Sequence, residues 1–546
     1  MPDIHTDPFN VICGILGTYF FCYSFVSYLL KDRLYLSEPL LSLLVGLLVS
    51  PSAAKLAHPD AYVSIDPQAN PLSTAHRLER ATLDFSRLVL CIQVCLTGAQ
   101  LPRRYARFHW RDLFLLLGPA MAGMWMMSAL LVWSIVRVPG KDTDSETATT
   151  MPFLHALAVA ACITPTDPVL SNTIVKGRWA DRYVPVPMSH LIGAESGAND
   201  GLGYPFVYLA LYLLKYLGTQ GYQGVPGDGG AAGSWGGARS AMGMWFGRTW
   251  GYLVLLGAVW GGVVGWVTRR CLKVAVALGY TSQENLYTVT VVIAVFLVGT
   301  CGLVGSDDIL ACFVAGNALS WDGWFQKETR HDSFEPAIDM LLTMAFFVWF
   351  GAVCPWPLFI SSFVPLWRLV VVAITILLLR RLPVLLLLYK QLRPVHHPRQ
   401  ALFMGFFGPI GVSAIFYQHE AMEFLRTEVK GPDGEIRQDA QTLSDLVRVV
   451  VWFVVLSSAV IHGLSIPIYQ CARYLIQHIK PGETEHSLRD MIRSEKEYIL
   501  SRPWVSKLEA DLEAAEAPLR NLARPKPPFR RLRVEREEEP RPELSR

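Results

Sequence analysis

Long apolar runs constrain this chain more than any other feature of its sequence. Most of them approach the roughly 20 residues that a helix needs to cross the hydrocarbon core of a bilayer. Hydrophobic residues make up 52% of the 546 residues and charged residues only 17%, whereas soluble domains carry about 25% charged residues. The sequence therefore predicts an all-α membrane protein that crosses the bilayer many times.

The runs place about 13 transmembrane helices along the chain. In chain order we expect them at residues 9–30, 39–56, 85–101, 113–136, 153–175, 186–214, 245–267 and 286–304, in a short span that starts near 307, and at 334–352, 369–388, 401–417 and 446–467. A glycine-rich stretch at 219–237 is interpreted as a flexible outer connection. We expect a transmembrane domain over residues 1–470 and a cytoplasmic tail over residues 471–546.

Two basic clusters indicate how the chain is oriented. They consist of Arg103, Arg104, Arg107 and Arg111 after the third span, and of Arg269, Arg270 and Lys273 at the end of the seventh. Basic loops remain on the cytoplasmic side of a membrane, so we expect the N-terminus outside and the C-terminus inside. The net charge of +3 is too small to predict nucleic-acid binding, and no motif for a cofactor is present.

Asp200 lies in the middle of the sixth expected span, with no cation near it in the sequence. A charge at the centre of a membrane helix costs roughly 2.5–3.5 kcal/mol, so such residues usually serve a function. Burial favours the protonated form of a carboxyl group, and a carboxylate can then hold a proton or a monovalent cation but not both. Asn199 is expected to bond this carboxylate or to shape its surroundings. The alternative is a structural aspartate that a neighbouring helix satisfies.

The fifth expected span contains Thr164-Pro165-Thr166-Asp167-Pro168. Proline cannot donate to the helical ladder and disfavours helical geometry in the preceding residue, so this span is expected to unwind in mid-membrane. Freed carbonyls and the hydroxyls of Thr164 or Thr166 then offer oxygen ligands for a cation. Asp167 supplies a negative charge to the positive ends of facing half-helices. The alternative is a proline-kinked helix with a capping aspartate.

A second interruption, Gly408-Pro409-Ile410-Gly411, falls in the twelfth expected span. Paired interruptions are typical of transporters built from two inverted repeats around a central site. Arg380 or Arg381 can balance the carboxylates or the negative half-helix ends, although Arg380 is equally interpreted as a residue whose charge reaches the interface. Glu195 is interpreted as a member of a structural ion pair, and direct binding of the transported ion is the alternative.

Six motifs resemble those of the fungal plasma-membrane sodium/proton antiporters, within the monovalent cation:proton antiporter superfamily. They occur in the family order and cover nearly all of the membrane region. They are the Thr-Pro-Thr-Asp-Pro run at 164–168, Ala-Glu-Ser-Gly-Ala-Asn-Asp-Gly at 194–201, Gly-Ser-Asp-Asp-Ile-Leu-Ala-Cys-Phe at 305–313, Arg-Arg-Leu-Pro at 380–383, Gly-Phe-Phe-Gly-Pro-Ile-Gly at 405–411 and His-Gly-Leu-Ser-Ile-Pro at 462–467.

The resemblance implies two inverted repeats with broken crossing helices, a mobile core domain beside a dimerisation domain, and a homodimer. It implies that Asp200 with Asn199 is the family's ion-binding pair and that Asp167 with Thr166 is its unwound-helix pair. Two further implied elements are the paired acids Asp307 and Asp308 and the intramembrane arginine, which Arg381 matches best.

The resulting hypothesis is secondary active exchange of cytoplasmic Na⁺, with Li⁺ or K⁺ as further cations, for extracellular H⁺. We expect the protein in the plasma membrane, surrounded by lipid, where it would serve cation tolerance and pH homeostasis, and we expect no enzymatic activity. Three alternatives stay open at this point. They are a K⁺/H⁺ exchanger of an internal membrane, an intramembrane aspartyl-type enzyme that uses Asp167 and Asp200, and a sensor that does not transport.

Overall fold

A computed structural model of the chain describes residues 7–63, 71–138, 149–168, 170–171, 183–218, 237–329, 334–361, 363–431 and 434–479. The chain divides into two compact units, Met1–Ile468 and Tyr469–Arg546. In the second unit the described residues are 469–479, which are helical. Residues 219–236 of the glycine-rich connection, residues 169 and 172–175 of the expected fifth span and most of the expected cytoplasmic tail lie outside the described residues.

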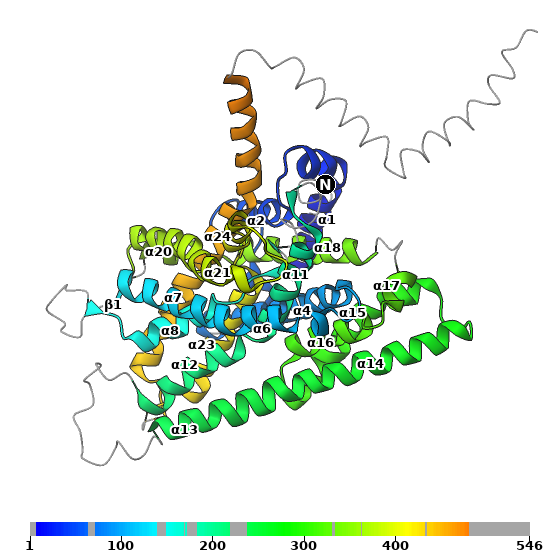
Figure 1. Ribbon diagram of the computed structural model, residues 1–546. Helices are drawn as coiled ribbons and strands as arrows, with labels where there is room; N and C mark the ends of the chain where they lie inside the picture. The colour runs from blue at the N-terminus through cyan, green and yellow to red at the C-terminus, as the bar shows by residue number, and fades with distance from the viewer. Residues whose placement is uncertain are drawn as a thin grey trace, which may run out of the picture. The chain divides into compact units, whose positions relative to one another are not determined.

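The described residues are almost entirely helical (Figure 1). The helices are α1 (Pro8–Tyr28), α2 (Glu38–Val49), α3 (Pro59–Val63), α4 (Pro71–Gln100), α5 (Tyr105–Phe108), α6 (Trp110–Leu115), α7 (Met121–Ile135), α8 (Phe153–Cys162), α11 (Val186–Gly201), α12 (Tyr204–Leu217), α13 (Gly237–Met244), α14 (Leu256–Ala277), α15 (Gln283–Val304), α16 (Asp308–Leu319), α17 (Trp324–Glu328), α18 (Phe334–Val353), α19 (Trp356–Ser361), α20 (Leu366–Leu379), α21 (Leu382–Leu388), α22 (Pro398–Phe406), α23 (Val412–Glu428) and α24 (Gln438–Ile479). Two short strands, β1 (Arg137–Val138) and β2 (Thr149–Thr150), pair antiparallel.

Eight helices among the described residues are long and apolar enough to cross a membrane. Three shorter apolar helices, α2, α8 and α16, lie where the second, fifth and ninth spans are expected. One of the long helices runs from Gly237 to Ala277 through α13, a π-helical stretch (Trp245–Leu255) and α14, and is drawn in green in Figure 1. The predicted all-α membrane fold is therefore confirmed, while the total of thirteen spans stays a prediction.

Three helices extend beyond the apolar runs from which the spans are predicted. α4 begins at Pro71 rather than near residue 85, α23 continues to Glu428, and α14 ends at Ala277 rather than near residue 267. The additional turns carry charged side chains that have partners; for example, Lys273 of α14 pairs with Asp322 at 2.6 Å. Hydropathy places the end of a span where charges begin, but a helix continues when those charges are paired or reach water.

Apart from the fifth and twelfth spans, where interruptions are expected, two further expected spans are each divided into two helices. The sixth breaks at residues 202–203 between α11 and α12, and the eleventh breaks at residues 380–381 between α20 and α21. Pro205 and Pro383 stand in the first turns of the helices that follow these breaks. Proline has no N–H for the carbonyl one turn earlier, so the chain kinks, and in both places it does so beside candidate site residues.

Glycines bring several helices into close backbone contact. At each of the following positions a Cβ would fall closer than 3.0 Å to the backbone of the facing helix: Gly98 and Gly316 between α4 and α16, Gly261 and Gly265 of α14 against α16, and Gly46 and Gly351 between α2 and α18. Small residues at four-residue spacing allow this approach inside a membrane, where packing rather than the hydrophobic effect holds helices together. Gly201 of α11 likewise faces the backbone of Leu310 in α16.

We predict that Gly316→Ala lowers the free energy of unfolding by about 1–3 kcal/mol, because the added methyl group forces α4 and α16 apart. Thermal unfolding of the purified protein in detergent measures the change. Gly299→Ala in α15 is the matched control, since a Cβ there meets nothing within 4 Å. Equal unfolding midpoints for the two variants would contradict the close contact between α4 and α16.

Candidate functional site

The two predicted interruptions meet each other in the structure. α8 ends at Cys162, and helix resumes at Pro168; α22 ends at Phe406, and α23 begins at Val412. The backbone N–H of Asp167 in the first interruption donates to the carbonyl of Pro409 in the second, at 3.0 Å. The prediction of two broken helices that cross at their unwound segments is therefore confirmed.

Asp167 lies where the half-helices that follow the two interruptions begin. Its Oδ2 accepts a hydrogen bond from the N–H of Leu170 at 3.2 Å, as a helix-capping residue does. Its carboxylate also lies against Gly411, where a Cβ would fall closer than 3.0 Å to it, and α23 starts with the next residue. Helix N-terminal ends carry partial positive charge, so one buried carboxylate balances both of these ends.

Arg380 occupies the complementary position at the helix ends that precede the interruptions. Its guanidinium donates to the carbonyl of Ile163, just after α8, and to the carbonyl of Gly408, just after α22, the latter at 2.6 Å. The side chain is 2% exposed, so the interpretation of Arg380 as a residue that reaches the interface is wrong. Carbonyls at helix C-terminal ends carry partial negative charge, and this arginine neutralises two such ends.

Arg381 has a different partner from Arg380. Its guanidinium forms an ion pair with Glu195 at 2.6 Å, and its Nε donates to the carbonyl of Met404 at 3.0 Å. Both side chains of the pair are buried. Of the two interpretations of Glu195, the structure shows the ion pair. The arginine at the crossing is Arg380, although the motif match favours Arg381.

Asp200 and Asn199 reach the crossing from the last turn of α11. The Asn199 side chain donates to Thr166 Oγ1 at 2.6 Å and accepts from the Thr166 N–H at 3.3 Å. It therefore shapes the site by fixing the unwound segment, and the two bonds to Thr166 use both polar ends of its amide. Thr164 is buried as well, with its hydroxyl donating to the carbonyl of Ala160 at 2.7 Å.

The Asp200 carboxylate differs from the other buried acids of the crossing. It is 0% exposed, and neither of its oxygens accepts a hydrogen bond from the described residues. Ser413 in the first turn of α23 and Asp167 both lie close enough to the Asp200 carboxylate to act on it electrostatically. A buried carboxylate in this setting needs a proton or a cation.

Two side chains of α24, Ser458 and His462, hold the second interruption. His462 opens the motif at 462–467, whereas the sequence does not point to Ser458. His462 Nε2 lies 3.0 Å from the carbonyl of Phe406, and its Nδ1 lies 3.1 Å from Ser458 Oγ. Ser458 Oγ in turn accepts from the N–H of Ile410 at 2.8 Å. Backbone groups that an unwound helix frees must find partners inside a membrane, and this pair of side chains serves both ends of the gap.

Asp307 and Asp308 lie at the start of α16 rather than at the crossing. Asp307 is the N-cap, and its side chain accepts from the N–H of Leu310 at 2.9 Å. Asp308 pairs with Arg87 of α4 at 2.5 Å. Arg87 is a further site residue that sequence reasoning misses, because nothing in an apolar run indicates which acid a distant arginine will meet.

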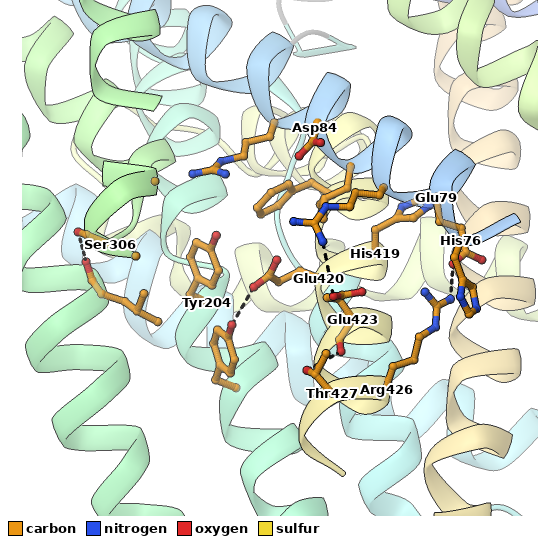
Figure 2. A pocket seen from close by; sticks show the side chains of 18 of the residues that line it. His76, Glu79, Asp84, Tyr204, Ser306, His419, Glu420, Glu423, Arg426 and Thr427 are labelled. Atoms are coloured by element: carbon orange, nitrogen blue, oxygen red, sulfur yellow. Dashed lines mark hydrogen bonds and ion pairs between the residues drawn. The ribbon is translucent and has the colours of Figure 1, made fainter. Parts of the chain in front are cut away.

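A pocket of about 750 Å³, which Arg87 lines, opens between the first turns of α4 and the last turns of α23 (Figure 2). Its lining is charged and aromatic: Glu79, Asp84, Arg87, Tyr204, Phe416, Glu420, Glu423 and Arg426 contribute to it. Glu79 forms ion pairs with Arg426 of α23 and Arg448 of α24. Glu420, which is labelled in Figure 2, accepts from the Tyr208 hydroxyl at 2.8 Å. Phe416 links the pocket to the crossing, since it precedes Tyr417, whose hydroxyl donates to the Asp200 carbonyl.

Comparison with known proteins identifies the family. A family model for the transmembrane sodium/hydrogen exchangers matches residues 20–470. The chain belongs to this family. Because the family consists of transporters, the expectation of a transporter rather than an enzyme is confirmed, and the predicted likeness to fungal antiporters is confirmed by the relatives that follow.

Two curated yeast proteins show how far the exchanger likeness extends. A probable Na⁺/H⁺ antiporter of Schizosaccharomyces pombe is 34% identical over 84% of this chain and 56% of its own length. Na⁺/H⁺ antiporter 2 of Zygosaccharomyces rouxii is 31% identical over 85% of this chain and 53% of its own length. The chain thus spans about half the length of these exchanger relatives.

A solved structure shares the exchanger fold. The sodium proton antiporter of Methanocaldococcus jannaschii superposes with a TM-score of 0.55 and 15% sequence identity, covering 83% of this chain and 99% of that one. At this level of identity the likeness concerns the fold alone.

We predict that Arg381→Ala lowers the free energy of unfolding by about 3–5 kcal/mol, because it leaves the Glu195 carboxylate buried without its partner. The double variant Arg381→Met with Glu195→Gln removes both charges and is expected to recover most of that loss. Thermal unfolding in detergent measures both. Lys215→Met is the control, since its pair with Glu428 is partly exposed and such pairs contribute about 0–1 kcal/mol. If Arg381→Ala were as stable as the double variant, the result would contradict a buried ion pair between Arg381 and Glu195.

Proposed function

We propose that this chain is a secondary active antiporter that exchanges cytoplasmic Na⁺ for extracellular H⁺ across the plasma membrane. Li⁺ and K⁺ are proposed as further cations. In this role the protein would remove cations from the cell, for cation tolerance and pH homeostasis, and would work as a homodimer. The names of its relatives support the exchange of these two ions.

One observation carries the proposal: the Asp200 carboxylate is buried at the crossing with neither oxygen bonded by the described residues. Asp167 and Arg380 already balance the helix ends around it. Asp200 is therefore the group whose charge can change without dismantling the crossing.

The exchange follows from competition at this carboxylate. With a proton bound, Asp200 is neutral and leaves no charge to attract a cation. Without the proton, its negative charge binds Na⁺, with Asp167 and the hydroxyl oxygens of Thr166 and Ser413 as the nearby groups that can complete an oxygen shell. Because proton and cation exclude each other, a protein that changes access only when one of them is bound exchanges the two at a fixed ratio.

The expected orientation assigns the charged pocket to the extracellular side. The pocket is lined by the first turns of α4, the end of α15 and the last turns of α23, and with the N-terminus outside these ends face outward. We propose that the pocket is the extracellular access route. Asp307 and Asp308 support transport from this side, where the Asp308–Arg87 ion pair joins α16 to α4.

We predict that Asp200→Asn abolishes exchange, because an amide of the same size neither carries the charge nor takes up the proton. Dissipation of a pH gradient in proteoliposomes by added Na⁺ measures the activity. Asp60→Asn, an exposed position in α3, is the matched control and is expected to exchange like the wild type. Continued Na⁺-driven exchange by Asp200→Asn would rule out this site assignment.

The same assay separates the proposal from its alternatives. Adding Li⁺, K⁺ or choline in place of Na⁺ distinguishes Na⁺/H⁺ from K⁺/H⁺ exchange, and choline reports leakage. A fluorescent tag at the C-terminus, viewed in living cells, distinguishes the plasma membrane from an internal one. A gradient that no cation dissipates, with folded wild-type protein, would contradict transport altogether.

A further inference from the structure

The break between α11 and α12 leaves the backbone beside Asp200 without its normal helical bonds. α11 ends at Gly201, and α12 begins at Tyr204. In a continuous helix the Gly201 carbonyl would accept from residue 205, but that residue is proline and has no N–H. Inside a membrane such a carbonyl requires another donor.

The Tyr417 hydroxyl supplies this donor from the neighbouring helix. It donates to the carbonyl of Asp200 itself and lies 3.5 Å from the carbonyl of Gly201. The side chain is 0% exposed. Its ring lies against Gly203, where a Cβ would fall closer than 3.0 Å to the ring atoms, so only glycine at position 203 allows the tyrosine to reach the break.

The Tyr417 ring also belongs to an aromatic cluster at the edge of the charged pocket. Tyr204 packs edge-on against Tyr417 at 5.3 Å between ring centroids, and Phe416 packs against Tyr417 at 5.1 Å. Tyr204, which is labelled in Figure 2, and Phe416 both line the pocket, while Tyr417 bonds to Asp200. The cluster thus connects the pocket wall to the residue that carries the proposed exchange.

We propose that Tyr417 is a positioning residue for ion exchange: its hydroxyl holds the main chain of Asp200 at the helix break and thereby sets where the Asp200 carboxylate lies. The inference rests on the proposed function. It adds a residue that acts through Asp200 and does not itself contact the ion. Among the described residues, no other side chain donates a hydrogen bond to the Asp200 or Gly201 carbonyl.

The test is the Na⁺ dependence of exchange in proteoliposomes, measured over a range of pH. Tyr417→Phe keeps the ring and removes the hydroxyl, so the protein is expected to fold. Loss of one buried hydrogen bond is expected to raise the KM for Na⁺ by roughly five- to tenfold and to shift the pH profile, with the maximal rate largely kept. Tyr23→Phe, which removes a buried hydroxyl that donates to Glu38 at 3.2 Å in α2, is the matched control and is expected to leave KM unchanged.

A second variant reaches the same contact without removing any polar group. Gly203→Ala adds a methyl group against the Tyr417 ring and displaces the hydroxyl from Asp200, so it should also raise KM. A raised KM in both variants, with Tyr23→Phe unchanged, supports the proposal. An unchanged KM and pH profile in Tyr417→Phe, or a lower rate alone, would overturn it. Wild-type protein that exchanges no ions would instead contradict the proposed function.

Discussion

The neutralisation of facing helix ends is the interaction on which the rest of this structure depends. Two unwound segments cross inside the membrane, where freed backbone groups and helix-end charges cannot be left to water. Asp167 balances the ends that begin beyond the interruptions, and Arg380 balances the ends that stop before them. His462 and Ser458 bind the backbone of the second gap. With these charges committed to the fold, Asp200 is the acid of the crossing whose two carboxylate oxygens accept no hydrogen bond from the described residues.

Close packing fixes how near Asp200 can lie to its surroundings. Gly201 lets α11 approach the backbone of α16, and Gly411 lets the second interruption approach the Asp167 carboxylate. Larger residues at either position would separate the elements that meet at the site. The Arg381–Glu195 pair ties the α20–α21 break to α11 at 2.6 Å, one turn and a half before Asp200. The geometry around one carboxylate therefore depends on contacts with at least four other elements, which explains why the site needs residues spread along the whole membrane region.

Much of the fold and the centre of the site follow from the sequence, for identifiable reasons. Hydropathy places the spans, and the prolines of residues 164–168 and 408–411 predict the interruptions, because their effects are local. The ends of α4 and α23 are not predicted, since their charged turns line a pocket that only the folded chain creates. The choice between Arg380 and Arg381 is not predicted either. Neighbouring arginines in a kinked helix point in different directions, and only the packing decides which one meets the helix ends. Arg87 and Tyr417 are missed because their partners are distant in the sequence.

The central claim is that a proton and Na⁺ compete for Asp200, and proton release on Na⁺ binding tests it most directly. Purified protein in weakly buffered solution is titrated with NaCl while the pH is followed, with choline chloride as the control for ionic strength. The account predicts that Na⁺ releases protons, that choline does not, and that Asp200→Asn abolishes the release. Release that persists in Asp200→Asn, or that is absent from wild-type protein shown to exchange Na⁺ for H⁺, would contradict it.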